Sequence, residues 1–357
     1  MLTAITLQNF RTYKKRTISL HPRLTLIIGP NAIGKTNILE AMYALAIGKS
    51  FRAEKEEEVI TWEEEIGRVV GKTEEDTLEL LVTHGVVGGE YAPKKRFMVN
   101  GVTRRLIDFT GKMPAVLFWP EDLSLVIDSP STRREYLNRV LIQIDREYRR
   151  NLYQYEKGLR QRNKVLFFIR EGTADRSQLP YWNELLIRTG QYITTKREEF
   201  VDFLNTRQHP VQKDRGSKSK EYTLHYDKSI ISEERLDQYK NEEISAKTTL
   251  VGPHRDDIIF NFTTDDKQTR RELANYGSRG EQRLGVLWCK LGELLFIEEK
   301  IGIKPMLFLD DIFSELDFQH QEDVIELITH YQTVMTSADR GVLQRFGHND
   351  LNLIELK

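Results

Sequence analysis

Short apolar runs and helical patterns alternate near both ends of the chain. The largely apolar run at 24–28 leads through a loop into residues 37–47, which have helical periodicity. Towards the other end, residues 279–299 also have helical periodicity, and residues 304–309 and 333–336 are apolar enough for core strands. Buried strands that alternate with helices indicate an α/β fold with a parallel sheet.

Strand-like patterns occupy much of the rest of the first third. Residues 1–11 alternate between apolar and other side chains, and residues 66–102 form a longer strand-like stretch. Its turn signals are Gly85, Gly88–Gly89 and Asn100–Gly101. Residues 115–119 and 257–262 are further candidate strands.

The middle of the chain has a different pattern. From about residue 130 to residue 208, turn signals are scarce and apolar residues recur every three or four positions, with one seven-residue step over Arg162. A break at 171–180 separates two series, so we predict two antiparallel helices that share an apolar seam. The first series runs from Leu137 to Leu166, about four heptads, which limits the length of any arm. We predict an exposed loop at 209–220.

Composition limits which cellular compartment and which class of protein fit this chain. The 357 residues suit two domains better than one. No apolar run approaches the roughly 18 residues that span a bilayer, and the first residues lack a signal-peptide core. The single cysteine, Cys289, excludes an internal disulfide and a cysteine-based zinc site, which fits a reducing cytoplasm. The net charge of -1 means that any nucleic-acid surface must come from local clustering.

One loop near the start carries phosphate-binding chemistry. Residues 29–36 match the pattern Gly-x-x-x-x-Gly-Lys-Ser/Thr in full, between a predicted strand and a predicted helix. Successive backbone N–H groups in such a loop point at phosphates. Lys35 is expected to reach the β- and γ-phosphates of ATP, and Thr36 to hold Mg²⁺. The expected nucleotide-binding residues are Gly29, Pro30, Asn31, Ala32, Ile33, Gly34, Lys35, Thr36 and Asn37.

Two carboxylates near the end complete this chemistry. The apolar run at 306–309 ends in Asp310 and Asp311, with Asp310 lying 274 residues after Thr36. We expect Asp310 to provide the second protein ligand of Mg²⁺, and Asp311 to act catalytically by orienting or deprotonating the attacking water. The alternative is that paired acids only cap a strand end. A compact P-loop domain is smaller than this gap, which predicts an inserted second domain.

A further phosphate-binding surface is predicted at Ser278. Ser278, Gly280 and Gln282 lie at the N-terminus of the helix predicted at 279–299. One nucleotide does not need two such surfaces from one subunit, so we predict that Ser278 acts in trans, on the ATP of a partner copy. Residues 314–317 would then lie at the seam of a head-to-tail pair. The alternative for Ser278 is an ordinary helix N-cap.

Basic residues form one candidate DNA surface. If residues 135–166 are a single helix, seven cations project opposite the apolar seam. They are Arg139, Arg146, Arg149, Arg150, Lys157, Arg160 and Lys164. Such a stripe suits backbone binding that is insensitive to sequence. The alternative is a solvated helix face, since Glu135, Asp145 and Glu156 dilute the charge.

Together these motifs resemble the ABC-type ATPase heads of chromosome-maintenance proteins such as SMC and Rad50, and more closely the bacterial RecF family of recombination mediators. The motifs are Gln8-Asn9-Phe10-Arg11, Gly48-Lys49-Ser50-Phe51-Arg52, Phe118-Trp119-Pro120-Glu121-Asp122-Leu123, Val251-Gly252-Pro253-His254-Arg255-Asp256-Asp257, Tyr276-Gly277-Ser278-Arg279-Gly280-Glu281-Gln282-Arg283 and Asp310-Asp311-Ile312-Phe313-Ser314-Glu315-Leu316-Asp317.

The resemblance implies an ABC-type head with an inserted, mainly helical domain. We place the head at 1–118 and 246–357 and the insertion at 119–245. It also implies a weak, DNA-stimulated ATPase that uses ATP and Mg²⁺, dimerises on ATP, and binds gapped duplex or single-strand/double-strand junction DNA. By the same resemblance Arg11 contacts the nucleotide. Thr336 or Ser337 takes the place of the switch histidine of transporter heads.

The family's role further implies cytoplasmic work in DNA replication, recombination, repair and the SOS response. The implied partners are RecR, and through it RecO, in loading RecA onto SSB-coated single strands. The competing interpretation is the ATPase subunit of a transporter, or another ABC-type head with a protein client. The helical insertion and the two-acid strand end disfavour a transporter. The arms are too short for a structural head of the SMC or Rad50 type, and a small-molecule kinase would leave Ser278 without a role.

Overall fold

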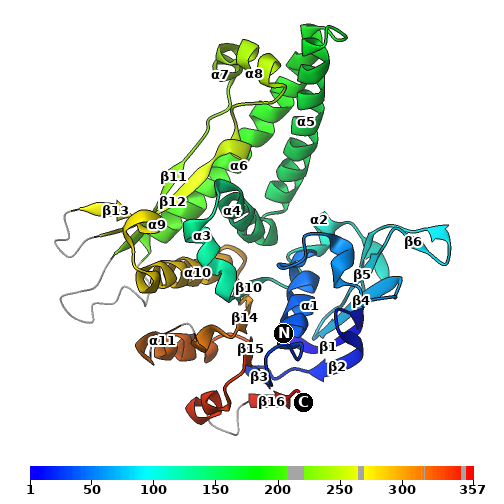
Figure 1. The fold of residues 1–357 in the computed structure, drawn as a ribbon, viewed down its shortest axis with the longest axis vertical. Coiled ribbons are helices and arrows are strands. Elements are labelled where there is room, and N and C mark those ends of the chain that lie inside the picture. Colours follow the sequence, from blue (N-terminus) through cyan, green and yellow to red (C-terminus); the bar gives the residue numbers. More distant parts are fainter. Residues whose placement is uncertain (208–220, 264–268, 315, 317, 347–350) are drawn as a thin grey trace. The chain divides into compact units, whose positions relative to one another are not determined.

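The computed structural model describes residues 1–207, 221–263, 269–314, 316, 318–346 and 351–357. The predicted exposed loop at 209–220 lies outside the described residues. The described chain divides into two compact units, the first made of Met1–Asp122 and Glu293–Lys357 and the second of Leu123–Gly292 (Figure 1). The sequence predicted such an insertion into a head formed by both ends of the chain. The predicted first boundary, at 118/119, lies a few residues before the one in the structure.

The second boundary differs from the prediction at 245/246. Strand β12 (Asp257–Thr263), assigned to the head from sequence, pairs antiparallel with β11 (Tyr222–Asp227) along six residue pairs. Its other edge pairs with β13 (Arg270–Glu272). Because both partners belong to the second unit, β12 belongs there too, and the division falls at Gly292.

The core of the first unit is a parallel sheet in the order β10-β14-β15-β3-β16. Its strands are β3 (Leu24–Ile28), β10 (Ala115–Phe118), β14 (Met306–Asp310), β15 (Thr333–Ser337) and β16 (Leu351–Glu355). Every residue of β3, β14 and β15 is buried, which explains the largely apolar sequences of β3 and β14. The predicted α/β fold is therefore confirmed. Helix α1 (Lys35–Ile47) follows β3.

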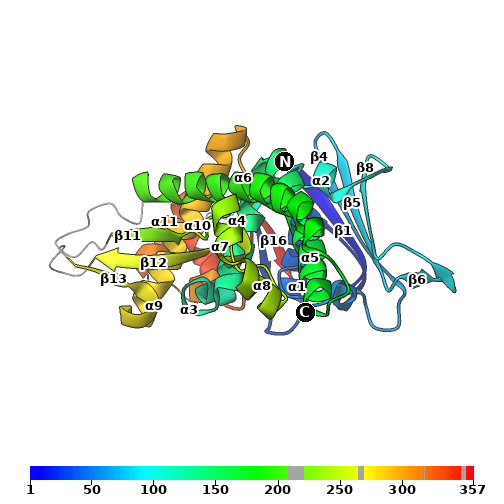
Figure 2. The ribbon, with the colours of Figure 1, turned by 90° about the horizontal axis from the view of Figure 1, so that it is seen from above.

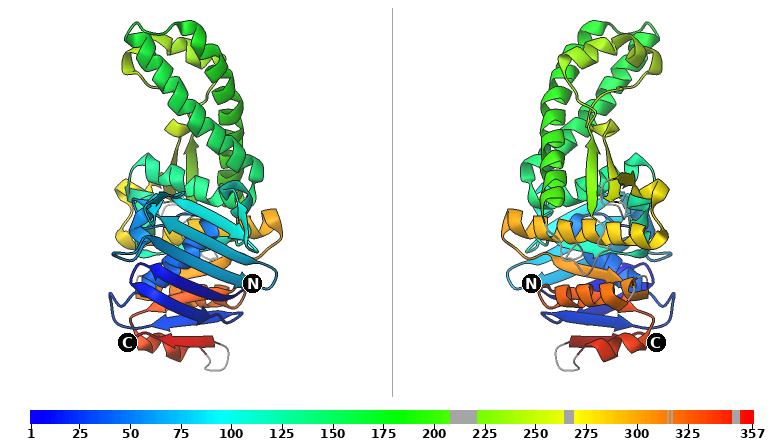
Figure 3. Two further views of the ribbon diagram at one scale, coloured as in Figure 1. Left: turned by 90° about the vertical axis from the view of Figure 1, so that its right-hand side faces the viewer. Right: turned by 90° about the vertical axis from the view of Figure 1, so that its left-hand side faces the viewer.

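An antiparallel sheet in the order β2-β1-β4-β5-β8-β9 completes the first unit (Figure 3). Its strands are β1 (Leu2–Phe10), β2 (Tyr13–Ser19), β4 (Ile66–Thr73), β5 (Thr77–Thr83), β8 (Lys95–Val99) and β9 (Val102–Arg104). Helix α1 contacts strands of both sheets. The predicted turn at Asn100–Gly101 joins β8 to β9 with positive φ at both residues, as a two-residue hairpin turn requires.

Short elements lie between these strands in the chain. The hairpin of β6 (Val86–Val87) and β7 (Glu90–Tyr91) extends from one end of the antiparallel sheet (Figure 2). The other short elements are η1 (Glu56–Val59), α2 (Leu106–Phe109), η2 (Pro120–Leu123), η6 (Ile312–Ser314), α11 (Phe318–Ile328) and η7 (Arg340–Arg345).

The second unit is mainly helical, as predicted. Its long helices are α4 (Pro130–Ile144), α5 (Arg146–Arg170), α6 (Leu179–Thr206) and most of α10 (Arg279–Ile301). The shorter ones are α3 (Ser124–Ile127), η3 (Arg176–Gln178), α7 (Glu233–Gln238), α8 (Lys240–Ala246), η5 (Pro253–Arg255) and α9 (Leu273–Tyr276). Helices α5 and α6 pack along each other and form the predicted pair (Figure 1).

The single helix predicted over 135–166 is wrong. The backbone of Asp145 is extended, and this residue ends α4 and caps α5. One carboxylate oxygen of Asp145 accepts the backbone N–H of Tyr148 at 3.0 Å, and the other accepts the Tyr192 hydroxyl at 2.9 Å. An aspartate that satisfies a free N–H group at a helix start favours a new helix there.

The residue that interrupts the apolar seam, Arg162, is itself buried. Its guanidinium donates to Glu243 at 2.6 Å, to the Thr249 hydroxyl at 2.8 Å and to the Asn183 side chain at 2.8 Å. A buried charge is tolerated only when it is paired and hydrogen-bonded, and this set of partners meets that need. The seam therefore continues through Arg162.

The motif at 254–257 has a structural task in the second unit. Asp256 is fully buried and accepts hydrogen bonds from Arg197 at 2.9 Å, from the backbone of Ser229 at 2.7 Å, and from the Tyr226 hydroxyl. Arg197 also donates to the carbonyl oxygen of Pro253 at 2.7 Å. A single carboxylate thus connects α6, β11 and the turn at η5.

Its neighbours add two more connections. Asp257 accepts both ends of the Arg133 guanidinium at 2.6 and 2.9 Å, which ties the motif to α4. His254 lies between the Tyr155 hydroxyl, at 2.7 Å, and the carbonyl oxygen of Thr249, at 3.0 Å. Burial lowers the pKa of His254 to about 4, so it is neutral at pH 7. This cluster connects α4, α5, α6 and β11.

We predict that Asp256→Ala destabilises the protein by about 3–5 kcal/mol, because it leaves the Arg197 charge buried without its carboxylate. Urea unfolding followed by circular dichroism measures the change. The matched control is Lys228→Ala, which removes a partly exposed ion pair with Glu198 and should cost less than about 1 kcal/mol. Similar losses in the two variants would contradict the assigned role of Asp256.

Candidate nucleotide-binding site

The predicted phosphate loop connects β3 to α1, in the strand–loop–helix order that such a loop requires. Ala32 and Gly34 have positive φ angles of 64° and 104°. Gly34 is also needed for space, since a Cβ there would lie 2.9 Å from the Tyr13 hydroxyl. The Lys35 amine donates to the carbonyl oxygens of Gly29 at 2.7 Å and Pro30 at 2.9 Å. The lysine, near the end of the loop, is thus hydrogen-bonded to the two residues at its start.

The sheet brings Thr36 and Asp310 together across the chain. The Thr36 hydroxyl donates to Asp310 Oδ1 at 3.0 Å, and the Thr336 hydroxyl donates to the same oxygen at 2.6 Å. Asp310 is only 6% exposed. Burial raises the pKa of Asp310 above its usual range, while the two hydroxyls and the positive charge of Arg52 act in the opposite direction.

This pair fits the implied Mg²⁺. Magnesium in nucleotide sites takes one or two carboxylates and completes its shell with phosphates and water. Among the described residues, no group of three or more His, Cys, Asp or Glu side chains could hold a metal ion. A hydroxyl beside one desolvated carboxylate therefore suits a cation that arrives with a triphosphate.

Asp311 lies one residue beyond the candidate metal ligand, in a constrained conformation. Its φ of 51° is unusual for a residue other than glycine. Its N–H donates to the Thr336 hydroxyl at 3.1 Å, and its carbonyl oxygen accepts the Ser314 hydroxyl at 2.7 Å. Asp311 also lines a cavity of about 900 Å³ that is bordered by η6, α11 and η7. Thr336, one of the two residues suggested for the switch position, thus contacts both acids.

A buried glutamate that the sequence did not single out organises the other side of α1. Glu40 is fully buried and accepts two hydrogen bonds from Arg11, at 2.6 and 2.9 Å, and one from the Ser50 hydroxyl at 2.5 Å. Arg52 lies 3.8 Å from the same carboxylate and donates to the Asn37 side chain at 3.2 Å. Two of the family motifs therefore meet at Glu40, one turn after Thr36.

Arg11, which was expected to contact the nucleotide, uses its guanidinium nitrogens for contacts within the protein. The third guanidinium nitrogen of Arg11 donates to the carbonyl oxygen of Glu58 at 2.7 Å. All three nitrogens are thus engaged within the first unit. The sequence signal for Glu40 was a single acid within the apolar pattern of residues 38–47.

Ser278 lies at the start of α10, in the second unit, and has the contacts of a capping box. Its hydroxyl accepts the N–H of Glu281 at 3.3 Å, and the Glu281 carboxylate accepts the N–H of Ser278 at 2.6 Å. Ser278 and Gly280 are exposed. The ordinary N-cap interpretation therefore describes the contacts of Ser278 in this structure, while its exposure leaves it accessible to a ligand. Glu315 and Asp317, which were expected at the contact between the two copies of a head-to-tail pair, lie outside the described residues.

The expected nucleotide contact of Gln282 is not supported. Its side chain is 5% exposed and donates to the carbonyl oxygens of Leu273 at 3.3 Å and Ala274 at 3.2 Å. At this position on α10 the side chain points into the second unit rather than to the surface. Gln282 anchors α9 to α10.

The predicted basic stripe is divided between two helices. Arg139 lies on α4 and the other six cations lie on α5, because the chain breaks at Asp145. Arg149 is half-buried and donates to the carbonyl oxygen of Ile142 at 2.7 Å. The remaining cations on α5 are exposed, namely Arg146, Arg150, Lys157, Arg160 and Lys164.

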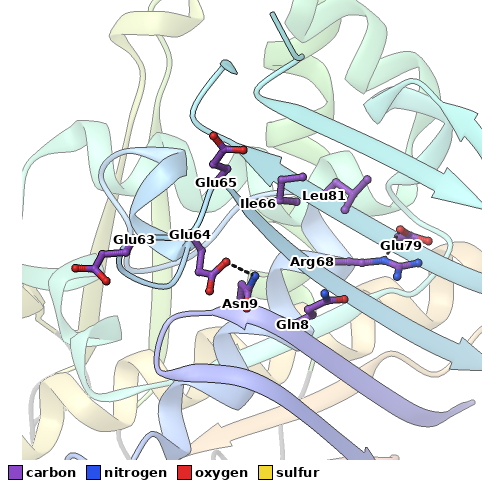
Figure 4. A pocket seen from close by; sticks show the side chains of 9 residues that line it. All are labelled: Gln8, Asn9, Glu63, Glu64, Glu65, Ile66, Arg68, Glu79 and Leu81. Atoms are coloured by element: carbon purple, nitrogen blue, oxygen red, sulfur yellow. Dashed lines mark hydrogen bonds and ion pairs between the residues drawn. The ribbon is translucent and has the colours of Figure 1, made fainter. Parts of the chain in front are cut away.

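A second pocket in the first unit is chemically unsuited to phosphate. It has a volume of about 490 Å³ and is lined by Gln8, Asn9, Glu63, Glu64, Glu65, Ile66, Arg68, Glu79 and Leu81 (Figure 4). Arg68, the one cation, is paired with Glu79 at 2.7 Å, and Glu64 accepts from Asn9 at 2.9 Å. The carboxylates around it would repel a triphosphate.

The chain is similar to known proteins over most of its length. The family described as "RecF/RecN/SMC N terminal domain" matches residues 1–349. The chain belongs to this family. A DNA replication and repair protein RecF from Moorella thermoacetica is 37% identical over 349 residues, covering 96% of this chain and 91% of that protein. The RecF of Halalkalibacterium halodurans is 35% identical over 350 residues, covering 94% and 92%.

Solved structures of RecF are also similar to this chain. RecF with ATPrS has a TM-score of 0.85 at 27% identity and covers 100% of this chain and 96% of that one. RecF with ATP has a TM-score of 0.84 at 28% identity, covering 95% and 92%. An Smc head domain from Pyrococcus furiosus, at 15% identity and a TM-score of 0.51, shares the fold. In the described part of the chain, no helix is long and apolar enough to cross a membrane.

We predict that Asp310→Asn selectively removes stabilisation by Mg-ATP. The wild-type protein should gain about 2.7 kcal/mol at a ligand concentration one hundred times its Kd, and the variant less than about 1 kcal/mol. Without nucleotide the variant should be at least as stable as wild type, since it lacks a buried charge but keeps an oxygen for Thr36 and Thr336. Thermal unfolding measures both effects.

Asp311→Asn is the matched control, because it changes the adjacent acid and should keep the Mg-ATP gain. Equal Mg-ATP gains for Asp310→Asn and wild type would exclude Asp310 as a metal ligand.

Proposed function

We propose that this protein is an ATP-dependent DNA-binding clamp of DNA replication and recombinational repair. The observation that carries the proposal is the Thr36–Asp310 hydrogen bond, which joins the two separated halves of a nucleotide site in a chain similar to RecF along its whole length. The two solved RecF structures named above are described as RecF-ATPrS and RecF-ATP in the RecFOR pathway.

The first unit would hold the nucleotide. The backbone of residues 29–37 and the Lys35 amine would bind the phosphates, and Thr36 and Asp310 would hold Mg²⁺. The bound Mg²⁺ would neutralise charge on the β- and γ-phosphates. Asp311 would orient or deprotonate the attacking water. Arg11 would reach the nucleotide only by exchanging some of its partners at Glu40 and Glu58.

We further propose that ATP joins two copies of the chain. The exposed Ser278 and Gly280 at the start of α10 would meet the γ-phosphate bound by the partner copy. A two-fold symmetric pair repeats this contact, so that two ATP molecules lie between the copies. ATP hydrolysis, slow and stimulated by DNA, would then control a conformational state rather than form a product.

The DNA would be a gapped duplex or a single-strand/double-strand junction. The proposed partners are RecR, with RecO, in a process that loads RecA onto SSB-coated single strands during repair and the SOS response. The name of the RecFOR pathway in the similar structures supports these partners. The proposed compartment is the cytoplasm, in keeping with the single cysteine.

We predict that Asp311→Asn traps the ATP-bound dimer on DNA, because it keeps the metal ligand Asp310 but impairs hydrolysis. Fluorescence anisotropy of a labelled gapped duplex, in Mg-ATP and again in Mg-ADP, measures this. Wild type should bind tightly only with Mg-ATP, and the variant's complex should persist at least about tenfold longer after excess unlabelled DNA is added.

Two results would oppose this proposal. An Asp311→Asn variant that stays monomeric with ATP would contradict the role of Ser278 in trans. A wild-type protein that binds no DNA in either nucleotide state would leave the nucleotide site but exclude the clamp.

We also predict that the cations of α5 contribute salt-sensitive DNA affinity. Replacing Arg146, Arg150 and Lys157 together by Glu should reduce the slope of log affinity against log salt by about 2–3, since each lost phosphate contact removes about 0.9. The charge-matched control replaces the exposed Lys14, Lys15 and Lys55 of the first unit by Glu. Unchanged affinity and slope in the α5 variant would remove this face from the DNA site.

A further inference from the structure

The exposed side of α5 carries aromatic rings as well as cations. Tyr153 is 64% exposed, Phe167 42% and Phe168 38%. At about 100° per residue, these three rings project on the same side of the helix as its exposed cations. The opposite side is buried and includes Tyr148, Tyr155, Arg162 and Leu166. Packing within the second unit therefore does not explain the exposed rings.

The two phenylalanines form a small cluster with cations at the C-terminal end of α5. Their rings meet edge to face, with centroids 5.5 Å apart. The Lys164 amine lies 5.8 Å from the centre of the Phe168 ring, and the Lys247 amine, which is paired with Glu171 at 3.0 Å, lies 4.7 Å from that of Phe167. A cation over one face of an exposed ring provides an anion-binding group directly beside an apolar, flat surface.

This combination favours nucleotides with unstacked bases. In a duplex the base faces are covered by their neighbours, so a duplex can use the cations but not the rings. An unpaired strand can place its phosphates on the cations and its bases on the rings. From Tyr153 to Phe168 the helix rises roughly 22 Å, about the length of six stacked bases.

The distribution of acids identifies the part of α5 that suits such a strand. Glu147 lies 3.8 Å from Arg150, and Glu156 is also exposed, so acids dilute the N-terminal half of this face. From Lys157 to Phe168 the exposed positions are Lys157, Arg160, Gln161, Lys164, Phe167 and Phe168, with no acid among them.

We propose that this face of α5 binds the unpaired strand of the DNA, with the backbone on Lys157, Arg160 and Lys164 and the bases stacked on Tyr153, Phe167 and Phe168. The proposal rests on the proposed DNA-binding function and specifies which part of a gapped or junction substrate α5 contacts. An acidic, apolar protein segment is the other occupant that the charge and the rings would admit, and the experiment separates the two.

The experiment combines Phe167→Leu with Phe168→Leu in the full chain. Leucine keeps an apolar side chain but removes the flat ring, and both positions are exposed, so the fold should be retained. Anisotropy in Mg-ATP compares a labelled single-stranded oligothymidine, a gapped duplex and a blunt duplex. We expect about tenfold weaker binding to the single strand and less than about a twofold change for the blunt duplex. The control is Tyr91→Leu, which removes a 90% exposed ring from the first unit and should leave all three affinities unchanged.

A second readout does not depend on a variant. An oligonucleotide with 5-iododeoxyuridine at successive positions, photo-crosslinked to the wild-type protein, should give adducts at Tyr153, Phe167 or Phe168. Crosslinks that fall only outside α5 would overturn the proposal. So would wild-type single-strand affinity in the double variant, or an equal loss on all three DNAs. A wild-type protein that binds duplex but no single strand would also overturn it, while the clamp function would stand. Failure of the wild type to bind any DNA would instead count against the proposed function itself.

Discussion

The candidate nucleotide site depends on the order of strands in the parallel sheet. Strand β15 lies between β3 and β14, so the P-loop and the acid pair emerge at the same edge although they are 274 residues apart. Thr336, on the intervening strand, donates to Asp310 and accepts from Asp311. The site therefore forms only when both ends of the chain have joined one sheet, which makes nucleotide binding a report on the folding of the whole head.

Buried ion pairs inside the second unit also join segments that are far apart in the chain. Arg162 and Arg197 are buried charges on neighbouring helices. Arg162 is paired with Glu243 and Arg197 with Asp256, and both carboxylates lie between β11 and β12 in the chain. Such pairs contribute little net stability compared with apolar packing, but a wrong arrangement would leave a charge unpaired. They are well suited to fix one arrangement of α4, α5 and α6 around the motif at 254–257. Any DNA-binding face on α5 would then be held on a rigid support.

The sequence predicted the elements whose signals are local. The P-loop, α1, β14 and the two-acid strand end each follow from a short stretch of residues. The break at Asp145 was missed because apolar spacing continues from Leu141 through Ile144 to Tyr148 while the backbone leaves the helix. Arg162 was interpreted as a gap in the seam because its partners, Thr249 and Glu243, lie more than eighty residues away. Glu40 and Gln282 are similar cases, since their orientation is set by residues on other elements.

A mixing experiment shows whether one copy's Ser278 completes the other copy's nucleotide site, as proposed. Lys35→Ala and Ser278→Arg should each abolish ATP hydrolysis alone. In a mixture of equal amounts, half the dimers combine the two variants, and each of these has one site with neither defect. If Ser278 acts in trans, about a quarter of wild-type hydrolysis returns on mixing. A mixture no more active than its separate components would contradict it, because each chain would then have to complete its own site.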